Sequence, residues 1–224
     1  MFYFRCVEKI AVISSDIINS SQFDEQAFLN TMHVLEEPAG TYLTNKGEPV
    51  LSSRGDSFQL MTVDIQHSFM KSIYLKSFFK KQQVGLKDER EKAPIDIRIS
   101  LAVGLAKEIP DHIGKSMEEP FVLSGRALDQ MKKKKQSFII STSHEEYNKE
   151  FELICSFLDH LFNGWTLAQA EVIYYLVQGY KQKEIAGILN LSQPSVSNRI
   201  QLANWNLIEK TNRRFLEIVE KIDE

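Results

Sequence analysis

Hydrophobic residues follow two different spacings along the first 143 residues of the chain. Runs rich in Val, Ile and Leu with alternating polar positions are typical of strands, whereas apolar residues three or four positions apart are typical of amphipathic helices. The pattern predicts, in order, a strand over Lys9–Ile18, a helix over Phe23–Leu35, a strand, turn and strand over Leu51–Val63, a helix over Phe69–Phe79, a charged loop over Lys80–Lys92, a strand over Ile95–Leu105, a helix over Ser124–Lys135 and a strand over Ser137–Ser141. This order predicts an α/β domain over residues 1–143.

The remaining residues show helical spacing only. An amphipathic pattern over Glu145–Phe162 predicts a long helix, which we take as a connection spanning residues 144–163. The residues after it, 164–224, predict a small all-α domain. A last amphipathic pattern over Leu207–Ile222 either closes the core of that domain or pairs with its copy in a dimer.

Residues 181–201 predict two short helices around a tight turn. Apolar residues recur at helical spacing on both sides of a break near Asn190. They are Ile185, Ile188, Leu189, Leu191, Val196 and Ile200. Ser192 can cap the second helix with its hydroxyl, and Pro194 suits the first turn of a helix. A helix before this pair should begin after Thr166 and end at Gly179.

The second short helix presents a polar face if Val196, Ile200 and Ala203 face inward. Its candidate base-reading residues are Gln193, Ser195, Ser197, Asn198 and Gln201, beside the outward Pro194, and the candidate phosphate contacts are Lys181, Lys183, Arg199, Arg213 and Arg214. Gln and Asn can make paired hydrogen bonds to adenine edges, whereas Lys and Arg meet phosphates. The pattern therefore predicts double-stranded DNA as a partner, with a three-helix unit that binds protein as the alternative.

Composition narrows the classes of function. The chain has 224 residues, a formal net charge of −3, 43% hydrophobic and 25% charged residues, which is typical of a globular protein and excludes wholesale packaging of polyanions. Cys6 and Cys155 are far apart and form no metal-binding or disulfide pattern. No apolar run approaches the 18 residues that span a bilayer, and no leader pattern opens the chain, so we expect a cytoplasmic protein without a membrane partner.

The C-terminal motif resembles known DNA-binding domains. The residues that carry the likeness are Leu167, Glu171, Val172, Leu176, Gly179, Glu184, Ile185, Ala186, Leu189, Ser192, Val196 and Ile200. Their spacing resembles the helix-turn-helix domains of LuxR-type regulators and of promoter-reading domains of sigma factors. The resemblance implies a small all-α helix-turn-helix domain that binds DNA.

The order strand, helix, hairpin, helix and strand over roughly residues 7–143 resembles the palm-type domain of class III nucleotidyl cyclases, and Asp16 and Asp56 match the two metal-binding Asp residues of that family. Asp16 ends the first predicted strand, and Asp56 follows Gly55 in the predicted hairpin. Two carboxylates brought together in this way can share Mg²⁺ ions that bridge the oxygens of a triphosphate. Alternatively, Asp16 caps the following segment and Gly-Asp is an ordinary hairpin turn.

The resemblance to class III nucleotidyl cyclases implies a ferredoxin-like, antiparallel-rich sheet covered by helices, and a nucleotide bound together with Mg²⁺. The candidate ligand-binding residues are Asp16, Asn19, Ser20, Arg54, Asp56 and Arg126, of which Asp16 and Asp56 would hold the metal. The chain has Asp129 where the family has a catalytic Asn and Lys133 where it has an Arg, which favours a ligand sensor over an enzyme.

The two halves together resemble the SatD family of bacterial proteins. The likeness rests on Asp16–Asn19, Ser20 and Gly55–Phe58. We expect a dimeric, DNA-binding transcriptional regulator whose first domain senses a nucleotide or another phosphate-bearing ligand, with a dimer contact that includes Leu216 and Val219. The alternatives are a metal-dependent nucleotidyl cyclase or phosphotransferase with an accessory helix-turn-helix domain, and an adaptor that binds only proteins.

Overall fold

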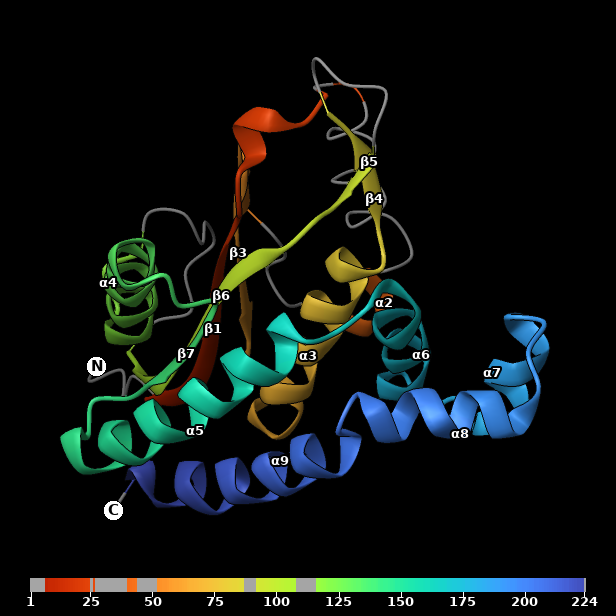
Figure 1. Ribbon diagram of the computed structural model, residues 1–224. Helices are drawn as coiled ribbons and strands as arrows, with labels where there is room; N and C mark the ends of the chain where they lie inside the picture. Colours follow the sequence, from red (N-terminus) through yellow and green to blue (C-terminus); the bar gives the residue numbers. More distant parts are fainter. Residues whose placement is uncertain are drawn as a thin grey trace.

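The chain folds into a mixed α/β structure with helices on both faces of a sheet (Figure 1). The computed structural model describes residues 7–24, 26, 40–43, 52–86, 92–107 and 116–223. The predicted α/β class is therefore confirmed for the described part of the chain. The predicted helix over Phe23–Leu35 falls mostly outside the described residues.

Strand β1 lies at the centre of the sheet because almost all of its side chains are buried. The strands are β1 (Glu8–Ile17), β2 (Ser52–Arg54), β3 (Ser57–Thr62), β6 (Ile97–Ala106) and β7 (Phe138–Ser141), in the order β2-β3-β1-β6-β7. β1 is antiparallel to both β3 and β6, whereas β7 is parallel to β6. Gly55 closes the turn between β2 and β3 at a φ of 63°, which glycine adopts without steric strain. The predicted strands of this sheet are confirmed.

The residues predicted as a charged loop contain a short strand. β4 (Gln83–Gly85) pairs with β5 (Lys92–Pro94) in a separate two-stranded sheet, so the loop prediction was wrong at this point. The cause is tertiary: Val84 is buried in the main hydrophobic cluster, although its neighbours in sequence are polar. Two short elements, η1 (Ser20–Gln22) and α2 (Gly40–Leu43), precede the hairpin.

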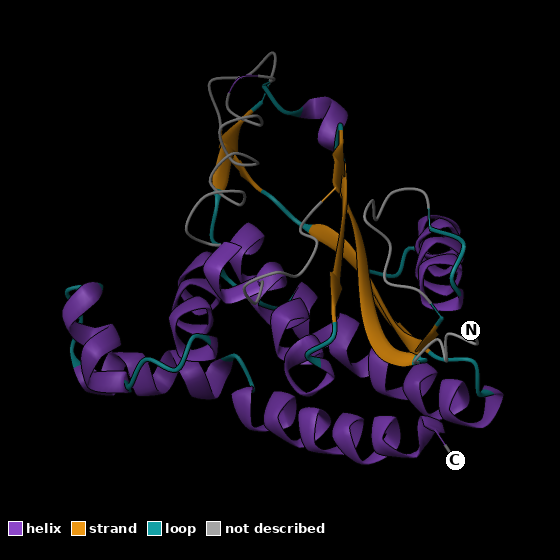
Figure 2. Cartoon of the chain, turned by 180° about the vertical axis from the view of Figure 1, so that it is seen from behind, coloured by secondary structure: helices purple, strands orange, loops and turns teal. Residues whose placement is uncertain are grey.

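The helices lie in layers around the sheet. Their bounds are α3 (Ile65–Lys80), α4 (Glu119–Lys134), α5 (Glu145–Asn163), α6 (Leu167–Val177), α7 (Gln182–Ile188), α8 (Gln193–Leu202), α9 (Trp205–Val219) and the short η3 (Glu220–Asp223). Figures 1 and 2 show α4 alone on one face of the sheet and α3 with α5 on the other. Helices α6 and α9 pack on the outer side of α3, and α7 with α8 extends beyond them, away from the sheet.

Helix α3 is buried on nearly every side, because the sheet covers one side and α6 and α9 cover the other. Its buried hydroxyls are satisfied within the helix: Ser72 Oγ donates to the Ser68 carbonyl at 3.1 Å, and Ser77 Oγ donates to the Tyr74 carbonyl at 2.9 Å. Buried polar groups that find such partners avoid most of the desolvation penalty. A helix with this many polar residues can therefore occupy the core.

Lys76 is the one charged side chain on α3 that is wholly buried among the described residues of that helix. Its Nζ lies 2.6 Å from Asp96 Oδ1 and donates to the Ile97 carbonyl at 2.7 Å. Lys80 adds a second ion pair to Asp96 at 3.3 Å. Burial lowers the pKa of Lys76, whereas the nearby Asp96 carboxylate opposes that change. The pair ties α3 to the start of β6.

The hydrophobic core crosses the predicted boundary after residue 163. One buried cluster contains β-strand residues together with Phe162, Trp165 and Phe215. The Phe69 ring of α3 lies 5.8 Å from the Phe215 ring of α9, measured between centroids. The C-terminal helices are therefore packed against the α/β part, and the proposal that residues 164–224 form a separate domain stays a prediction.

We expect Asp96→Asn to lower the free energy of unfolding by about 3 kcal/mol, because it leaves the buried ammonium of Lys76 without its counter-charge. Burial disfavours the charged carboxylate, yet Lys76 and Lys80 together lower the pKa of Asp96 below its ordinary value. A carboxyl whose folded-state pKa is lowered stabilises the fold above its unfolded pKa and loses that contribution as the pH falls. Urea unfolding at several pH values measures both effects.

The matched control is Glu209→Gln, since Glu209 is exposed on α9. The control should change the unfolding free energy by less than about 0.5 kcal/mol. Equal stability of the two variants at neutral pH would contradict a structural role for the Lys76–Asp96 pair.

Candidate functional site

Helices α7 and α8 are joined by a turn whose polar groups are satisfied locally. Asn190 adopts a left-handed backbone conformation with a φ of 52°, which Asn tolerates better than most residues. Ser192 Oγ then accepts a hydrogen bond from the Ser195 amide at 3.3 Å and caps α8, with Pro194 in the first turn. The predicted cap at Ser192 is confirmed.

The helix before this pair also has the predicted ends. Thr166 Oγ1 accepts from the Gln169 amide at 3.3 Å, and Gln169 Oε1 accepts from the Thr166 amide at 2.9 Å, which together form a capping box. Gly179 follows the last turn of α6 with a φ of 89°. Both predicted signals are confirmed.

A small hydrophobic cluster holds α6, α7 and α8 together. Its buried members are Val172, Ile185, Ala186 and Val196. Leu189, Leu191 and Ile200 are partly buried against it. Because one side of α8 packs on this cluster, the opposite side of the helix faces solvent.

The solvent side of α8 carries mainly amide and hydroxyl groups, and Leu202 is exposed at its end. Gln193, Ser197, Asn198 and Gln201 are exposed, as are Pro194 and the two lysines at the start of α7, Lys181 and Lys183. Ser195 and Arg199 are half-buried. The structure therefore places the candidate base-reading residues on one helix and Lys181 and Lys183 on the neighbouring one.

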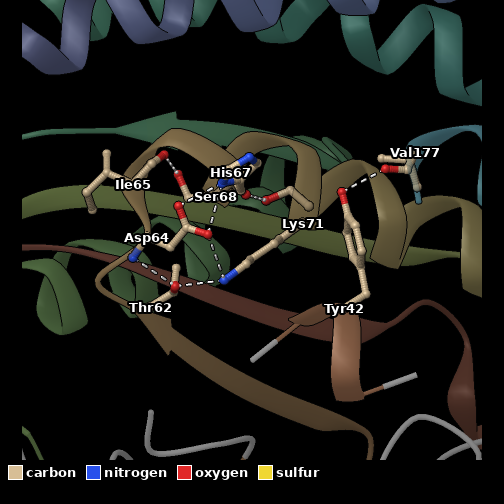
Figure 3. A network of polar contacts seen from close by, with 9 residues as sticks. Tyr42, Thr62, Asp64, Ile65, His67, Ser68, Lys71 and Val177 are labelled. Atoms are coloured by element: carbon tan, nitrogen blue, oxygen red, sulfur yellow. Dashed lines mark hydrogen bonds and ion pairs between the residues drawn. The ribbon is translucent and has the colours of Figure 1, made fainter. Parts of the chain in front are cut away.

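Hydrogen bonds hold the ends of the three-helix unit, one within the C-terminal helices and one from α2. Trp165 Nε1 donates to the Ala203 carbonyl at 3.1 Å, in a buried position directly after α8. Tyr42 Oη donates to the Val177 carbonyl at 2.8 Å, at the end of α6 (Figure 3). Burial and the charge of Asp64 raise the pKa of Tyr42 to about 12, so its hydroxyl stays a donor at neutral pH.

The polar network in Figure 3 continues at the start of α3. Asp64 Oδ1 lies 2.8 Å from His67 Nδ1, and Lys71 Nζ donates to Thr62 Oγ1 at 2.8 Å. Burial works against the charge of Asp64, but the hydrogen bond and charge of His67 and the charge of Lys71 lower its pKa overall. This network holds the β3–α3 junction.

Arg214 differs from its predicted role as a phosphate contact. Its guanidinium makes a bidentate pair with Glu150 of α5, with Nε 2.6 Å and Nη2 2.8 Å from the two carboxylate oxygens. It also contacts Glu217 at 2.9 Å. The Arg214 hydrogen bond lowers the pKa of Glu150. Arg214 therefore links α9 to α5, whereas Arg213 is exposed.

Asp16 lies at the end of β1 in a cluster of charges. Its carboxylate is buried, with Arg98 Nη1 3.2 Å from each oxygen and Lys132 Nζ 3.1 Å from Oδ2. Arg98 is the residue directly opposite Asp16 on β6, and Lys132 comes from α4. Two cations therefore share the Asp16 carboxylate, while the carboxylate of Asp56 lies on the neighbouring chain segment.

Asp56 lies on the neighbouring chain segment but has a different partner. Its backbone carbonyl accepts from the Ile17 amide at 2.9 Å, so it sits beside the end of β1. Its carboxylate accepts a hydrogen bond from the hydroxyl of Ser20, which follows the left-handed Asn19. Arg54 is on β2, and its side chain lies outside the described part of the structure.

These contacts do not suit a Mg²⁺ site. A Mg²⁺ ion binds carboxylate oxygens whose negative charge is not already neutralised, whereas the Asp16 carboxylate is paired with two cations. Within the described ranges, no group of three or more His, Cys, Asp or Glu side chains is placed to hold a metal ion. We therefore assign no step to a metal at Asp16 and Asp56.

Arg126 lies apart from the Asp16 cluster. It is exposed on α4 and lines a cavity of about 310 Å³ between α4, β7 and α5, together with Gln136 and Asn148. Arg126 precedes Lys132 by six positions, which is about 240° around a helix. The structure therefore brings Asp16 together with Arg98 and Lys132, and it brings Asp56 together with Ser20. Arg126 joins neither group.

The sequence pattern predicts no role for Arg98 and does not place Lys132 beside Asp16. Arg98 lies in the predicted strand Ile95–Leu105 among apolar residues. A cation in such a strand needs a nearby counter-charge, and this requirement is the sequence signal that points to a partner such as Asp16. Lys132 begins a run of four lysines, in which no local pattern distinguishes the one that pairs with Asp16. Both assignments depend on the register of β1 and β6 and on the packing of α4.

Comparison with known proteins gives no family assignment. No protein-family model matches the chain, and no curated protein matches it. None of the helices in the described residues is both long enough and apolar enough to cross a membrane. The functional conclusion must therefore come from the geometry of the chain itself.

We expect Asp16→Asn to lower the free energy of unfolding by about 2 kcal/mol, because Arg98 and Lys132 would then face each other without a shared anion. Thermal and urea unfolding measure this change. Asp129→Asn, which removes an exposed carboxylate from α4, is the control and should have little effect. An Asp16→Asn protein as stable as this control would show that the cluster is not a stabilising ion pair.

Proposed function

We propose that the protein is a transcriptional regulator that binds double-stranded DNA through α8. The observation that carries the proposal is the division of α8 into two sides. Val196 is buried against α6 and α7, whereas Gln193, Asn198 and Gln201 are exposed on the other side. Exposed amide side chains on a short helix are suited to reading base edges in the major groove.

The dimensions and position of α8 support this proposal. The helix has ten residues, which corresponds to a length of about 15 Å. A major groove of about 12 Å width admits an α-helix, and helix-turn-helix proteins read bases with the first residues of the second helix. α8 lies in the part of the molecule that extends away from the sheet (Figure 1).

The distribution of charge supports a phosphate contact by α7. Lys181 and Lys183 are exposed at its start, where the first helix of such a pair crosses the DNA backbone. The whole chain nevertheless carries a net charge of −3. Positive charge is thus local, and binding should depend on specific contacts and weaken as salt concentration rises.

The finer fold assignment is part of the proposal. The strand order β2-β3-β1-β6, with β1 antiparallel to both neighbours, supports a cyclase-like palm, and the α6–α8 arrangement supports a helix-turn-helix. We propose the family resemblance to SatD proteins on the same grounds. The catalytic alternative receives no support from Asp16, because that carboxylate is held by Arg98 and Lys132.

The first test is selection of duplexes from a randomised DNA pool, followed by gel-shift titration of the selected sequence. Asn198→Ala should weaken binding about 5- to 150-fold, which corresponds to losing one base contact of about 1 to 3 kcal/mol. Lys183→Ala should weaken binding to all sequences. It should also lower the slope of log affinity against log salt concentration by about one. Both side chains are exposed, so the fold should be unchanged.

Gln130→Ala is the matched control, since Gln130 is an exposed amide on α4, far from α8 in the fold. It should bind the selected duplex like the unchanged protein. If no sequence is enriched, or if Asn198→Ala and Gln130→Ala bind equally, α8 does not read DNA. Retention of a protein partner by the Asn198→Ala variant would then favour an adaptor.

We propose further that the effector is a phosphate-bearing ligand that binds at Asp16, Arg98 and Lys132. The two cations of this cluster support an anionic ligand, because the side chain of Lys132 is half exposed and can reach solvent. A change at this end of β1 can reach α8 through α3, which contacts both the sheet and α6. Such a ligand would favour one arrangement of the helices over another.

Thermal unfolding with ATP tests the effector. At ten times its dissociation constant, ATP should raise the melting temperature by about 3 °C, and Lys132→Ala should remove most of this shift. Lys134→Ala on the same helix is the control. An equal shift in both variants would contradict the assigned site, and a shift that appears only with Mg²⁺ would favour the metal-dependent alternative.

A further inference from the structure

Large apolar side chains remain exposed along the outer side of α5 and α9. Leu153 is 60% exposed, Phe157 is 68% exposed and Leu207 is 46% exposed. A single exposed apolar residue needs no explanation, but several that adjoin on two neighbouring helices indicate an interaction surface. We call the surface formed by Leu153, Ile154, Phe157, Leu161 and Leu207 the α5–α9 face.

This face contains both a groove and a projection. A groove of about 460 Å³ runs between α5 and α9 and is lined by Ile154, Leu161 and Leu207. The Phe157 ring lines the same groove and projects into solvent. An isologous contact places one patch against an identical patch, so the exposed apolar side chains of this face can be covered by the same face of a second copy.

The dimer contact predicted at Leu216 and Val219 is not available. Val219 is only 3% exposed and belongs to the main hydrophobic cluster, and Leu216 packs against that cluster. Their spacing reflects the packing of α9 against its own chain. The exposed side of α9 instead includes Leu207 and Lys210.

We propose that the α5–α9 face is the contact between two copies of this chain, related by a two-fold axis. The inference rests on the proposed function, because a regulator that reads two half-sites needs a subunit contact. The charges around the face favour a second copy. Toward the start of α5 lies the exposed Glu146, and toward its end lie His160 and, on α9, Lys210.

If the two-fold axis passes near Leu153, the α5 helices of the two copies cross there and run in opposite directions. Glu146 and His160 both lie seven positions from Leu153, and seven positions are close to two helical turns, so the three share one stripe of the helix. In the antiparallel crossing, Glu146 of each copy faces the His160 and Lys210 end of the other. Each end of the apolar centre then has Glu146 of one copy and Lys210 of the other, while Lys149 is already paired with Glu145 of its own copy.

This contact would also set the positions of the two reading helices. Asn204, which joins α8 to α9, lines the same groove as Leu207. The C-terminal end of each α8 therefore lies next to this groove. The two copies of α8 would leave the dimer from equivalent positions, as two half-sites on one face of DNA require.

Sedimentation of the full chain without DNA tests the contact. The unchanged protein should sediment with twice its chain mass of 25.8 kDa. Phe157→Asp, which buries a charge at the proposed centre, should weaken association at least about 100-fold and give a monomer. Met117→Asp is the matched control, because Met117 is 85% exposed before α4 and lies outside the face. Circular dichroism should show the same helix content in both variants.

Charge reversal tests the antiparallel geometry. Glu146→Lys and Lys210→Glu should each weaken the dimer about tenfold, and the double variant should recover most of the loss. Recovery supports the two-fold arrangement. A monomeric unchanged protein, a dimeric Phe157→Asp protein, or a double variant weaker than either single variant would overturn the inference.

Failure of this inference is distinct from failure of DNA binding. If Phe157→Asp is monomeric but the unchanged dimer selects no DNA, the contact stands and the proposed function falls. If the unchanged protein is monomeric but Asn198→Ala still loses DNA affinity, the reading helix stands and the α5–α9 contact falls.

Discussion

The burial of α3 on nearly every side is the constraint on which the rest of the structure depends. The sheet covers one side of this helix, and the C-terminal helices α6 and α9 cover the other. Lys76 can lie in this core only because Asp96 and the Ile97 carbonyl accept hydrogen bonds from its ammonium group, as water would at the surface. If α6 and α9 moved away, apolar residues on α3 and Phe215 on α9 would both be exposed to solvent. The C-terminal helices are consequently part of the main core.

This constraint determines what remains free for function. Because α6 is anchored against α3 and Trp165 holds the residue after α8, the three-helix unit has a defined position on the body. Its solvent surface includes the polar side of α8 and the start of α7, together with the exposed Ile188 and Leu202. Another apolar surface lies around the groove between α5 and α9. The polar and apolar surfaces therefore suit two different partners, a nucleic acid and a second copy of the chain.

The Asp16 cluster shows that a motif can lie where the sequence predicts it while its side chain has a different environment from the one expected. A strand that ends in Asp and a hairpin with Gly-Asp were both found where the sequence places them. The chemistry of Asp16 depends on Arg98, which is opposite it on the neighbouring strand β6, and on Lys132 from α4. A carboxylate between two cations is a different group from a carboxylate open to a metal ion. The motif by itself does not distinguish these environments.

The sequence alone determined the order of most elements, the caps at Thr166 and Ser192, and the inward side of α8, because these depend on neighbours within one or two helical turns. Tertiary structure decided the pairing of Arg214 with Glu150, the burial of Val219 and the short strand β4. Each of these depends on residues distant in sequence. Local periodicity marks the side of a helix that is apolar, but only the packed fold shows whether its own chain covers that side.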